Sequence, residues 1–278
     1  MSEAVMSEAA IRGDASELRL SIVIPAYNEQ ENLPRTIREL AATLLEAAIP
    51  FELIVVNDNS ADATAETVRR LAAELPQLRL VDRKPPRGFG RAVRAGLDAV
   101  TGDVVVLVMA DASDSPRDVV AYYRKISEGY DCVFGSRFIA GGKVTDYPRV
   151  KLIVNRIVNK VVQWMFRCPY NDLTNAFKAY RTDVVRELGT LQSCHFNVTL
   201  ELSLGTLVRR CRIAEIPISW TGRSWGASNL RLREMGRRYL ATILRAYADK
   251  TLLSDDLFAD RSASRAERES QRTCGKEG

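Results

Sequence analysis

The sequence contains few of the residues that build disulfide frameworks, zinc sites and histidine-based catalytic centres. Its 278 residues include five cysteines and one histidine, and no two cysteines have the C-x-x-C spacing. We therefore expect neither a disulfide framework nor a structural zinc site, and a reducing compartment fits this cysteine usage. Because His195 is the only histidine, a histidine-rich metal site is excluded, and we expect His195 to be a packing or surface residue rather than the base of a triad.

Long apolar runs are also missing. The first residues, MSEAVMSEAAIRGDASE, have neither a basic start nor an apolar core, so we expect no signal peptide. No segment reaches the roughly 18 uncharged apolar residues that a membrane span requires. Residues 254–278 are rich in charged and small side chains. We expect a disordered leader over 1–17, a folded domain over 18–253 and a disordered tail over 254–278.

The remaining composition is that of a globular protein with a mild basic bias. Hydrophobic residues make up 46% of the chain and charged residues 27%, which supports a sizeable core. The net charge of +5 is compatible with phosphates, anionic lipid surfaces or nucleic acid as binding partners.

Strand-like and helix-like segments alternate along the first half of the chain. The predicted strands are Leu20–Ala26, Phe51–Asn57, Leu78–Asp82, 104–108 and 131–134. The predicted helices are 29–47, one that begins at Asp62 or Thr64, 91–100 and 116–128. This order predicts an α/β fold, a Rossmann-like, doubly wound and mostly parallel sheet.

The fourth predicted strand leads directly into two carboxylates. Five apolar residues, four of them valine, occupy 104–108 and indicate a strand buried on both faces. Asp111 and Asp114 follow at the sheet edge where ligands bind in such folds, and two carboxylates can hold a divalent metal. The same residues also fit an acidic turn in which Asp114 caps a helix that begins at Pro116.

Polar and aromatic side chains follow the first two strands as well. After the first strand come Pro25, Tyr27 and Glu29. An alternative interpretation of this segment is a helix cap in which Asn28 and Glu31 form a capping box. Asp58 follows the second strand, where it can accept hydrogen bonds from a base or a ribose hydroxyl, although its neighbours are also generic turn residues.

Two later segments predict basic amphipathic helices. Residues 149–167 place seven apolar side chains on one face: Ile153, Val154, Ile157, Val158, Val161, Trp164 and Met165. Residues 231–250 repeat the pattern with Leu232, Met235, Tyr239, Ile243 and Tyr247. Such helices suit a membrane interface. The alternative is that both apolar faces pack against the protein's own core or a partner.

Taken in order, these segments resemble the family-2 glycosyltransferases, which have the GT-A fold. The matching segments are IVIPAYNE, VVNDNSADAT, RGFGRAVRAG and VLVMAD, followed by Gly135-Ser136-Arg137-Phe138, Gly141-Gly142-Lys143 and RSWGASN. The later segments are similar to the dolichol-phosphate mannosyltransferase branch and its bacterial polyprenyl-phosphate relatives. The resemblance covers roughly residues 19–250.

The resemblance implies a role for each matching residue. Pro25, Tyr27, Glu29 and Asp58 match positions that bind the donor nucleoside. Asp111 matches the second aspartate of the family's D-x-D motif for Mg²⁺ or Mn²⁺, and Asp114 offers a second contact. Four further residues match phosphate-binding segments: Ser136, Arg137, Arg223 and Ser228.

The chain departs from the family pattern at three positions. Met109 replaces the first aspartate of D-x-D, and a thioether is a poor ligand for Mg²⁺ or Mn²⁺. Ser113 replaces the usual glutamine two residues after Asp111, and Asn229 replaces the usual lysine.

The implied reaction moves a hexose from a GDP- or UDP-sugar to a polyprenyl phosphate, with inversion at the anomeric carbon. We expect a cytoplasmic enzyme that is peripheral at the inner face of the membrane. A soluble glycan or metabolite acceptor is the first alternative, and a non-catalytic nucleotide-sugar-binding protein is the second. Nucleic acid is not an expected partner, because the basic residues flank an apolar stripe.

Overall fold

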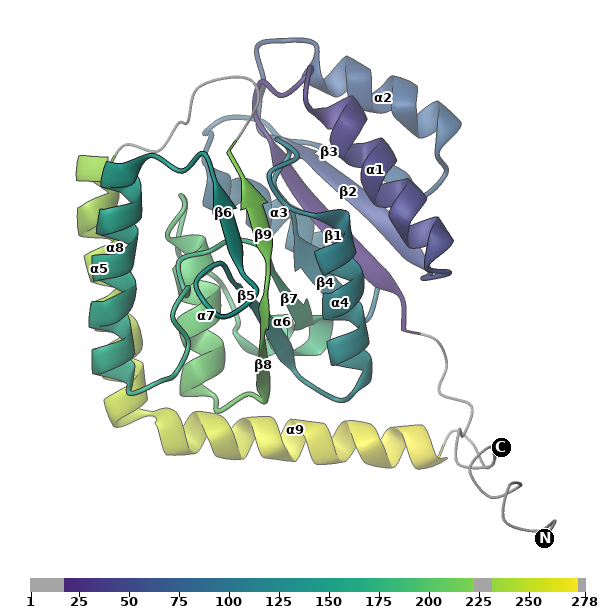
Figure 1. Ribbon diagram of the computed structural model, residues 1–278. Helices are drawn as coiled ribbons and strands as arrows, with labels where there is room; N and C mark the ends of the chain where they lie inside the picture. The colour runs from purple at the N-terminus through teal and green to yellow at the C-terminus, as the bar shows by residue number, and fades with distance from the viewer. Residues whose placement is uncertain (1–17, 223–231, 275–278) are drawn as a thin grey trace, which may run out of the picture.

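The computed structural model describes residues 18–222 and 232–274, and the expected leader over 1–17 lies outside them. A seven-stranded sheet forms the middle of three layers (Figure 1). Its strands are β1 Leu20–Ala26, β2 Phe51–Asn57, β3 Leu78–Asp82, β4 Val104–Leu107, β5 Cys132–Ser136, β7 Lys178–Arg181 and β8 Ile213–Pro217. They lie in the order β3-β2-β1-β4-β7-β5-β8. Only β7 runs antiparallel to its neighbours in this described sheet, so the predicted mostly parallel α/β fold is confirmed.

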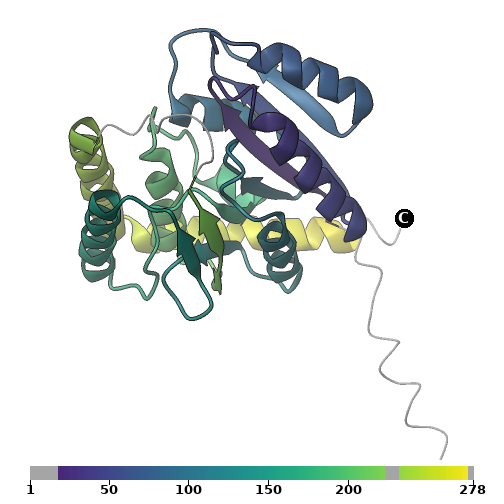
Figure 2. The same cartoon turned by 45° about the horizontal axis from the view of Figure 1, so that its top comes forward.

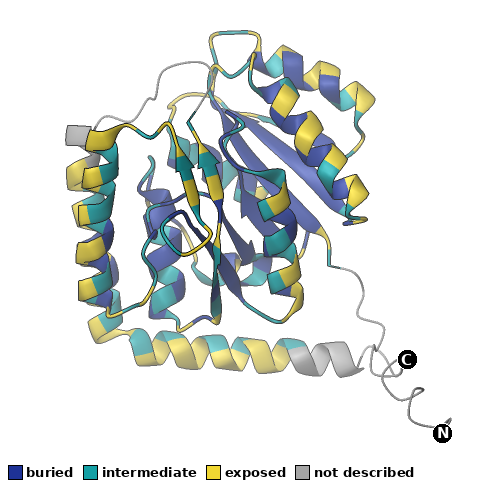
Figure 3. Ribbon diagram, in the orientation of Figure 1, coloured by how far each residue is buried: buried dark blue, intermediate teal, exposed yellow. Residues whose placement is uncertain are grey.

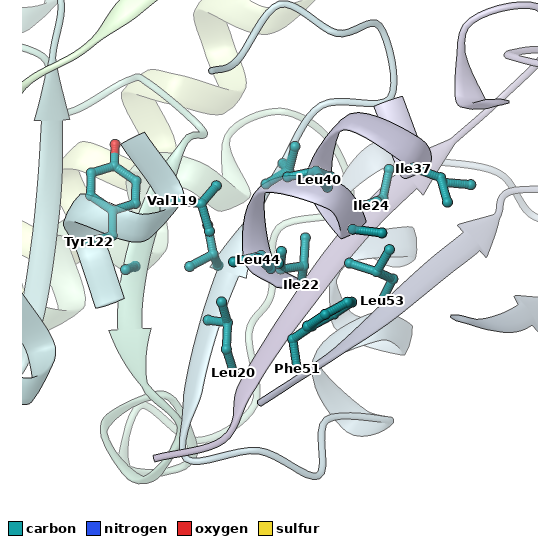
Figure 4. Packing of buried hydrophobic residues seen from close by; sticks show 14 of the residues in the cluster. Leu20, Ile22, Ile24, Ile37, Leu40, Leu44, Phe51, Leu53, Val119 and Tyr122 are labelled. Atoms are coloured by element: carbon teal, nitrogen blue, oxygen red, sulfur yellow. The ribbon is translucent and has the colours of Figure 1, made fainter. Parts of the chain in front are cut away.

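Three helices cover one face of the sheet: α1 Leu33–Glu46, α2 Thr64–Glu74 and α4 Pro116–Ser127. Figure 4 shows how α1 packs there, with Ile37, Leu40 and Leu44 over the apolar side chains of β1 and β2. Burial of each such side chain contributes about 1.5–3 kcal/mol relative to exposure. This packing explains the 3.6-residue apolar periodicity of α1.

The opposite face is covered by α3 Phe89–Asp98, α6 Thr182–Glu187 and α7 Val198–Val208. Two longer helices, α5 Arg149–Phe166 and α8 Leu232–Leu252, lie side by side outside α7 (Figures 1 and 2). Every residue of β1, β2, β4 and β5 is buried (Figure 3). Burial on both faces is the reason that these strands are continuous apolar runs rather than alternating ones.

A small second sheet lies beside the main one. It consists of two parallel strands, β6 Lys143–Thr145 and β9 Ser219–Thr221. A bridge between Asp114 and Trp220 joins it to the turn after β4. This sheet therefore brings residues near 145 and 220 to the carboxyl edge of the main sheet.

The first helix begins later than the sequence suggested, and the capping box considered as an alternative does not form. Residues 29–32 form a turn and α1 begins at Leu33. Asn28 adopts a left-handed conformation with φ of 55°. Its Oδ1 accepts a hydrogen bond from the Ala61 N–H at 2.9 Å, and its own N–H donates to Ser60 Oγ at 3.0 Å. Asn28 therefore joins the loops after β1 and β2 instead of capping α1.

The expectation of a disordered tail is also wrong for most of its length. Residues Ser254–Cys274 form helix α9, which runs along the edge of the molecule (Figure 1). Arg261 pairs with Asp131 at 2.7 Å and lies 3.4 Å from Glu187. Arg268 also pairs with Glu187. The tail's charges thus have defined partners in the domain, which composition alone does not reveal.

Within residues 18–222 and 232–274, no helix combines the length and apolar character needed to cross a membrane.

Candidate active site

A cavity of about 950 Å³ opens at the carboxyl edge of the sheet. It brings together six of the residues singled out in the sequence: Pro25, Tyr27, Glu29, Asp58, Asp111 and Arg137. They come from the ends of β1, β2, β4 and β5. In a doubly wound sheet these ends converge at one edge, which is why residues distant in sequence share a single cavity.

Tyr27 and Asp58 both line the cavity, and each contacts an arginine. The Arg87 guanidinium lies 4.3 Å from the centre of the Tyr27 ring, a cation–π contact. The Asp58 carboxylate accepts a hydrogen bond from the Gly88 N–H at 2.7 Å and pairs with Arg83. Asp58 therefore also holds the loop that leads into α3. An aromatic face, a carboxylate and cationic groups together suit a nucleoside and its phosphates.

Pro25 and Glu29 also line the cavity. Pro25 is buried within β1. The Glu29 N–H donates to Thr64 Oγ1 at 3.0 Å, and its Oε2 accepts a hydrogen bond from Asn32 Nδ2 at 2.6 Å. These contacts fix the loop after β1 against the start of α2 and orient the Glu29 carboxylate at the cavity.

The turn after β4 places its two carboxylates in different environments. Asp111 lines the cavity, and its Oδ1 accepts a hydrogen bond from the Ser113 N–H at 3.2 Å. Asp114 is buried outside the cavity lining, and its Oδ2 accepts a hydrogen bond from the Met109 N–H at 2.9 Å. Burial raises the pKa of Asp114 to about 7, and the charge of Asp111 adds to the rise. Asp114 thus fixes the turn, and α4 has no side-chain cap.

The residues present fit a divalent cation that is shared with a bound diphosphate. In the described ranges, no group of three or more His, Cys, Asp or Glu side chains could hold a metal ion. Mg²⁺ is commonly held by one or two carboxylates together with substrate phosphates and water. Asp111 can supply that carboxylate from the cavity wall, whereas the Met109 thioether is a poor ligand.

Arg137 is held rigidly at the opposite side of the cavity. Its Nε and Nη2 donate to the two carboxylate oxygens of Asp172 at 2.7 and 2.8 Å. Burial alone would lower the pKa of Arg137, but the charge and hydrogen bonds of Asp172 raise the pKa overall. The rings of Tyr147 and Trp220 lie 5.4 and 6.0 Å from its guanidinium carbon. Arg137 is thus a permanent, preorganised cation at the cavity.

Of the other predicted phosphate-binding residues, Ser136 lies among the described residues and does not line this cavity. Ser136 is fully buried, and its hydroxyl donates to Asn171 Oδ1 at 2.6 Å. It also accepts a hydrogen bond from the Phe138 N–H at 3.2 Å, so it shapes the turn that presents Arg137. Arg223 and Ser228 lie outside the described residues.

A fully buried lysine supports the loop beneath the cavity. Lys178 lies on β7, and its Nζ donates to the carbonyl oxygens of Leu173 and Asn175 at 2.7 and 2.5 Å. Burial lowers the pKa of Lys178 to about 7, with Asp172 opposing the decrease. The loop that it holds contains Asp172, which orients Arg137.

Several cavity residues were missed in the sequence. They are Arg87, Tyr147, Lys151, Thr174, Thr199, Trp220 and Arg238. Lys151 belongs to the first basic amphipathic helix, so its charge was visible but its position was not. Tyr147 and Trp220 are brought to the cavity by the short β6–β9 sheet, and their rings are 4.9 Å apart. Pairing between strands this short and this distant in sequence has no local signal.

A broad apolar surface lies on the outer faces of α5 and α8. On α5, Trp164 is 82% exposed, Ile153 59% and Ile157 58%, with Val150, Val154 and Val161 also exposed. On α8, Leu240, Leu244 and Tyr247 are exposed. Figure 3 shows the exposed outer face of α5. We call these residues the outer apolar face.

The two amphipathic helices therefore differ from each other. Most of the predicted apolar face of α5 is exposed, and α5 anchors itself instead through Val162 and Phe166. On α8 part of the predicted face packs inward, because Ile243 is buried and Tyr239 contacts the core, whereas Tyr247 is exposed. The side chains of Leu232 and Met235 are not among those that the structure describes.

Comparison with known proteins identifies a matching family and related sequences. The sequence model of the family described as "Glycosyl transferase family 2" matches residues 21–189. Polyprenol monophosphomannose synthase of Mycolicibacterium smegmatis is 28% identical over 218 residues, which are 76% of this chain and 81% of that protein. Dolichol-phosphate mannosyltransferase of Pyrococcus furiosus is 28% identical over 217 residues, which are 77% of this chain and 60% of that protein.

Solved structures of glucosyl-3-phosphoglycerate synthase from Mycobacterium tuberculosis share the fold. The complex with phosphoglyceric acid has a TM-score of 0.64 at 22% identity and covers 84% of this chain and 81% of that chain. The complex with Mn²⁺, UDP-glucose and phosphoglyceric acid has a TM-score of 0.63 at 22% identity, with coverage of 84% and 81%.

Proposed function

The chain belongs to glycosyl transferase family 2, and we propose that it transfers a hexose from a nucleotide sugar to a polyprenyl phosphate, inverting the anomeric carbon. One observation supports this most strongly. A single cavity joins the nucleoside-type residues Tyr27 and Asp58 to Asp111 and Arg137, and it is also lined by Lys151 from the helix that bears the outer apolar face. A charged donor and a lipid-borne acceptor can therefore meet there.

The donor's base and ribose are proposed to bind between Tyr27, Glu29 and Asp58, beside Pro25. Tyr27 supplies a ring face, and the carboxylates accept hydrogen bonds from N–H and hydroxyl groups. Arg87, which covers the Tyr27 ring at 4.3 Å, is placed to meet the diphosphate. The relatives named above include mannose-phosphate synthases, which favours GDP-mannose, while a UDP-sugar is the other donor considered.

Asp111 is the proposed ligand for Mg²⁺ or Mn²⁺. A cation held there would supply charge compensation for the leaving diphosphate. Asp114 is not placed to share this role, because its carboxylate is buried and engaged by the Met109 N–H. We propose that it acts by fixing the turn that presents Asp111.

The acceptor phosphate is the proposed nucleophile. One of its oxygens forms a bond to the anomeric carbon as the bond from that carbon to the diphosphate oxygen breaks, and the nucleoside diphosphate departs. A phosphate is already anionic near neutral pH, so this step needs no histidine base. Arg137, held rigid by Asp172, stabilises phosphate charge without reorganising. We propose that Arg223 and Ser228 contribute further phosphate contacts.

The outer apolar face is the proposed contact with the membrane. Exposed Trp164, Ile153 and Ile157 are accompanied by exposed Arg149 and Lys160 on the same helix. Aromatic and aliphatic side chains with flanking cations suit the interface of an anionic leaflet. The exposed face of α5 also favours a lipid acceptor over a soluble one, which would not require it. We propose a peripheral enzyme at the cytoplasmic face of the membrane.

The direct test is transfer of radiolabelled sugar to polyprenyl phosphate in lipid vesicles, with GDP-mannose, GDP-glucose, UDP-glucose and UDP-galactose in parallel. We expect one donor to give a lipid-linked product that requires Mg²⁺ or Mn²⁺ and disappears with a chelator. Product formed only on a soluble acceptor would replace the lipid assignment. Donor binding by calorimetry without transfer or hydrolysis would establish a non-catalytic binding protein instead.

A further inference from the structure

A second cavity, of about 660 Å³, lies between α7 and α8. It is lined by α3, the segment 188–197, one face of α7 and one face of α8, ending near Leu257. We call it the α7–α8 groove. It shares His195 and Arg238 with the active-site cavity but contains none of the proposed donor-binding or metal-binding residues. Its volume falls in the usual range for small-molecule sites.

The charge of the groove is unbalanced. It is lined by four arginines, namely Arg91, Arg209, Arg238 and Arg245, and by two carboxylates, those of Glu201 and Asp249. Glu201 already accepts hydrogen bonds from the N–H groups of Gln192 and Ser193 at 2.9 and 2.8 Å. Its distance to Arg245 is 3.7 Å, so this ion pair is loose.

Burial disfavours the charged form of Arg209. Its guanidinium is half-buried and donates a long hydrogen bond of 3.5 Å to the Gly205 carbonyl. Burial lowers the pKa of Arg209, and the nearby negative charges of Glu187 and Asp249 do not offset the decrease. A desolvated cation of this kind gains from an anion placed in the groove.

A residue that lines the groove also carries a buried hydrogen-bond acceptor without a partner. Asn197 lines it and is only 7% exposed, and its Oδ1 has no hydrogen-bond partner among the described residues. Its Nδ2 donates to Ser193 Oγ at 2.6 Å and to Thr242 Oγ1 at 3.0 Å. In this arrangement the Thr242 hydroxyl accepts from Asn197 and donates to the Arg238 carbonyl at 3.0 Å. A hydroxyl group brought to Asn197 Oδ1 would satisfy the remaining position of the amide.

We propose that the α7–α8 groove binds a small soluble phosphomonoester that carries a hydroxyl group, such as a polyol or sugar phosphate. The phosphate would lie among the groove arginines, and the hydroxyl would donate to Asn197 Oδ1. This site is separate from the donor and acceptor sites proposed above. Because the groove shares His195 and Arg238 with the active-site cavity, a ligand here is in contact with residues that also line the catalytic site.

The test is calorimetric titration of the full chain with glycerol 3-phosphate, propyl phosphate and glycerol. We expect glycerol 3-phosphate to bind more tightly than propyl phosphate, which lacks the hydroxyls, and glycerol alone not to bind. Arg245→Gln should weaken glycerol 3-phosphate binding by about tenfold or more. Arg245 is exposed on α8, so this variant should fold. In Asn197→Ala, the two phosphates should bind equally.

Arg87→Gln is the matched control, because Arg87 lines the active-site cavity and not the groove. It should leave glycerol 3-phosphate binding unchanged. The proposal is overturned if the wild-type chain shows no binding up to about 10 mM, or if Arg87→Gln abolishes binding while Arg245→Gln does not. Equal affinity of the wild type for both phosphates would refute the role of Asn197. None of these outcomes depends on glycosyl transfer, so the proposed function stands or fails separately.

Discussion

At the scale of single residues, one short turn places two aspartates in different environments. Asp111 and Asp114 are three positions apart, yet Asp111 lines the active-site cavity and Asp114 is buried against the Met109 N–H. The difference arises from the backbone path after β4. A carboxylate that faces a diphosphate can assist catalysis, whereas a buried carboxylate stabilises the turn.

Asp111→Asn is expected to lower kcat for sugar transfer by at least about a hundredfold, because the leaving diphosphate loses its metal-linked charge compensation. Initial rates at saturating donor and divalent cation measure this effect. Asp98→Asn, which alters an exposed carboxylate at the end of α3, is the control and should be neutral. If Asp111→Asn keeps its rate and metal requirement, Asp111 is not the ligand.

Lys178 predicts a dependence of stability on pH. Burial lowers its pKa to about 7 in the folded chain, against the opposing charges of Asp172 and Glu215 and with the support of Arg137. Between that value and the ordinary lysine pKa, the unfolded chain binds the extra proton, so this group makes stability rise with pH. The contribution is at most about 1.4 kcal/mol per pH unit.

Lys178→Met should therefore flatten the pH dependence of the free energy of unfolding between about pH 7.5 and about pH 9.5, measured by urea titration. Lys84→Met, in an exposed loop, should leave the dependence as in the wild type. Identical slopes for the wild type and Lys178→Met would show that Lys178 titrates normally.

The types of residue in the candidate active site could be predicted from the sequence, but their ion pairs and hydrogen bonds could not. Tyr27, Asp58 and Asp111 follow strands, and the carboxyl ends of parallel strands share one edge. The pairing of Arg137 with Asp172 and the support from Lys178 depend on β7 lying between β4 and β5. The position of β7 in the sheet depends on contacts between segments that are distant in sequence, so no local sequence pattern predicts it.

At the scale of elements, α9 shows how ion pairs order a segment whose composition suggests disorder. The Arg261 side chain is only 10% exposed and joins Asp131 at the start of β5 to Glu187 on α6. Asp131 also accepts a hydrogen bond from the Arg212 N–H at 2.6 Å. The helix is thus attached to the sheet edge through a buried cation.

Arg261→Ala should reduce the free energy of unfolding by about 2 kcal/mol, because it leaves buried carboxylates with fewer partners. Arg265→Ala is the matched control. Arg265 is 55% exposed and lies 4.0 Å from Asp131, so its loss should cost less than about 1 kcal/mol. Chemical denaturation of the full chain compares the two, and equal effects would contradict a specific role for Arg261.

At the scale of the whole molecule, the β-α alternation of the sequence predicted the parallel core. The antiparallel β7 and the small β6–β9 sheet could not be predicted in this way, because they depend on pairing between strands that are distant in sequence. The β6–β9 sheet brings Tyr147 and Trp220 to the active-site cavity, which residues of α5 also line. The outer apolar face and the cavity consequently share one helix, since Lys151 lines the cavity and Ile153 is exposed. This arrangement would let an enzyme resting on a membrane receive its acceptor from the lipid surface.

Because the outer apolar face lies outside the cavity, we expect substitutions on it to weaken membrane binding without slowing the sugar transfer itself. We expect Ile153→Ser, Ile157→Ser and Trp164→Ser, combined in one chain, to lose about tenfold or more of the affinity for anionic vesicles, measured by co-sedimentation. Transfer to long-chain polyprenyl phosphate in those vesicles should fall in parallel. Transfer to a short, water-soluble isoprenyl phosphate should stay within about twofold of the wild-type rate, because these side chains do not line the active-site cavity.

Leu45→Ser is the control for this experiment, because Leu45 is an equally exposed apolar residue on α1, at 59%, and belongs to a different surface. It should change neither vesicle binding nor transfer. Higher salt should weaken vesicle binding of the wild type further, since screening reduces the attraction between exposed Arg149 and Lys160 and anionic lipid. Loss of transfer to both acceptors in the triple variant would mean that the outer apolar face supports the fold. Unchanged vesicle binding would mean that the membrane contacts another surface.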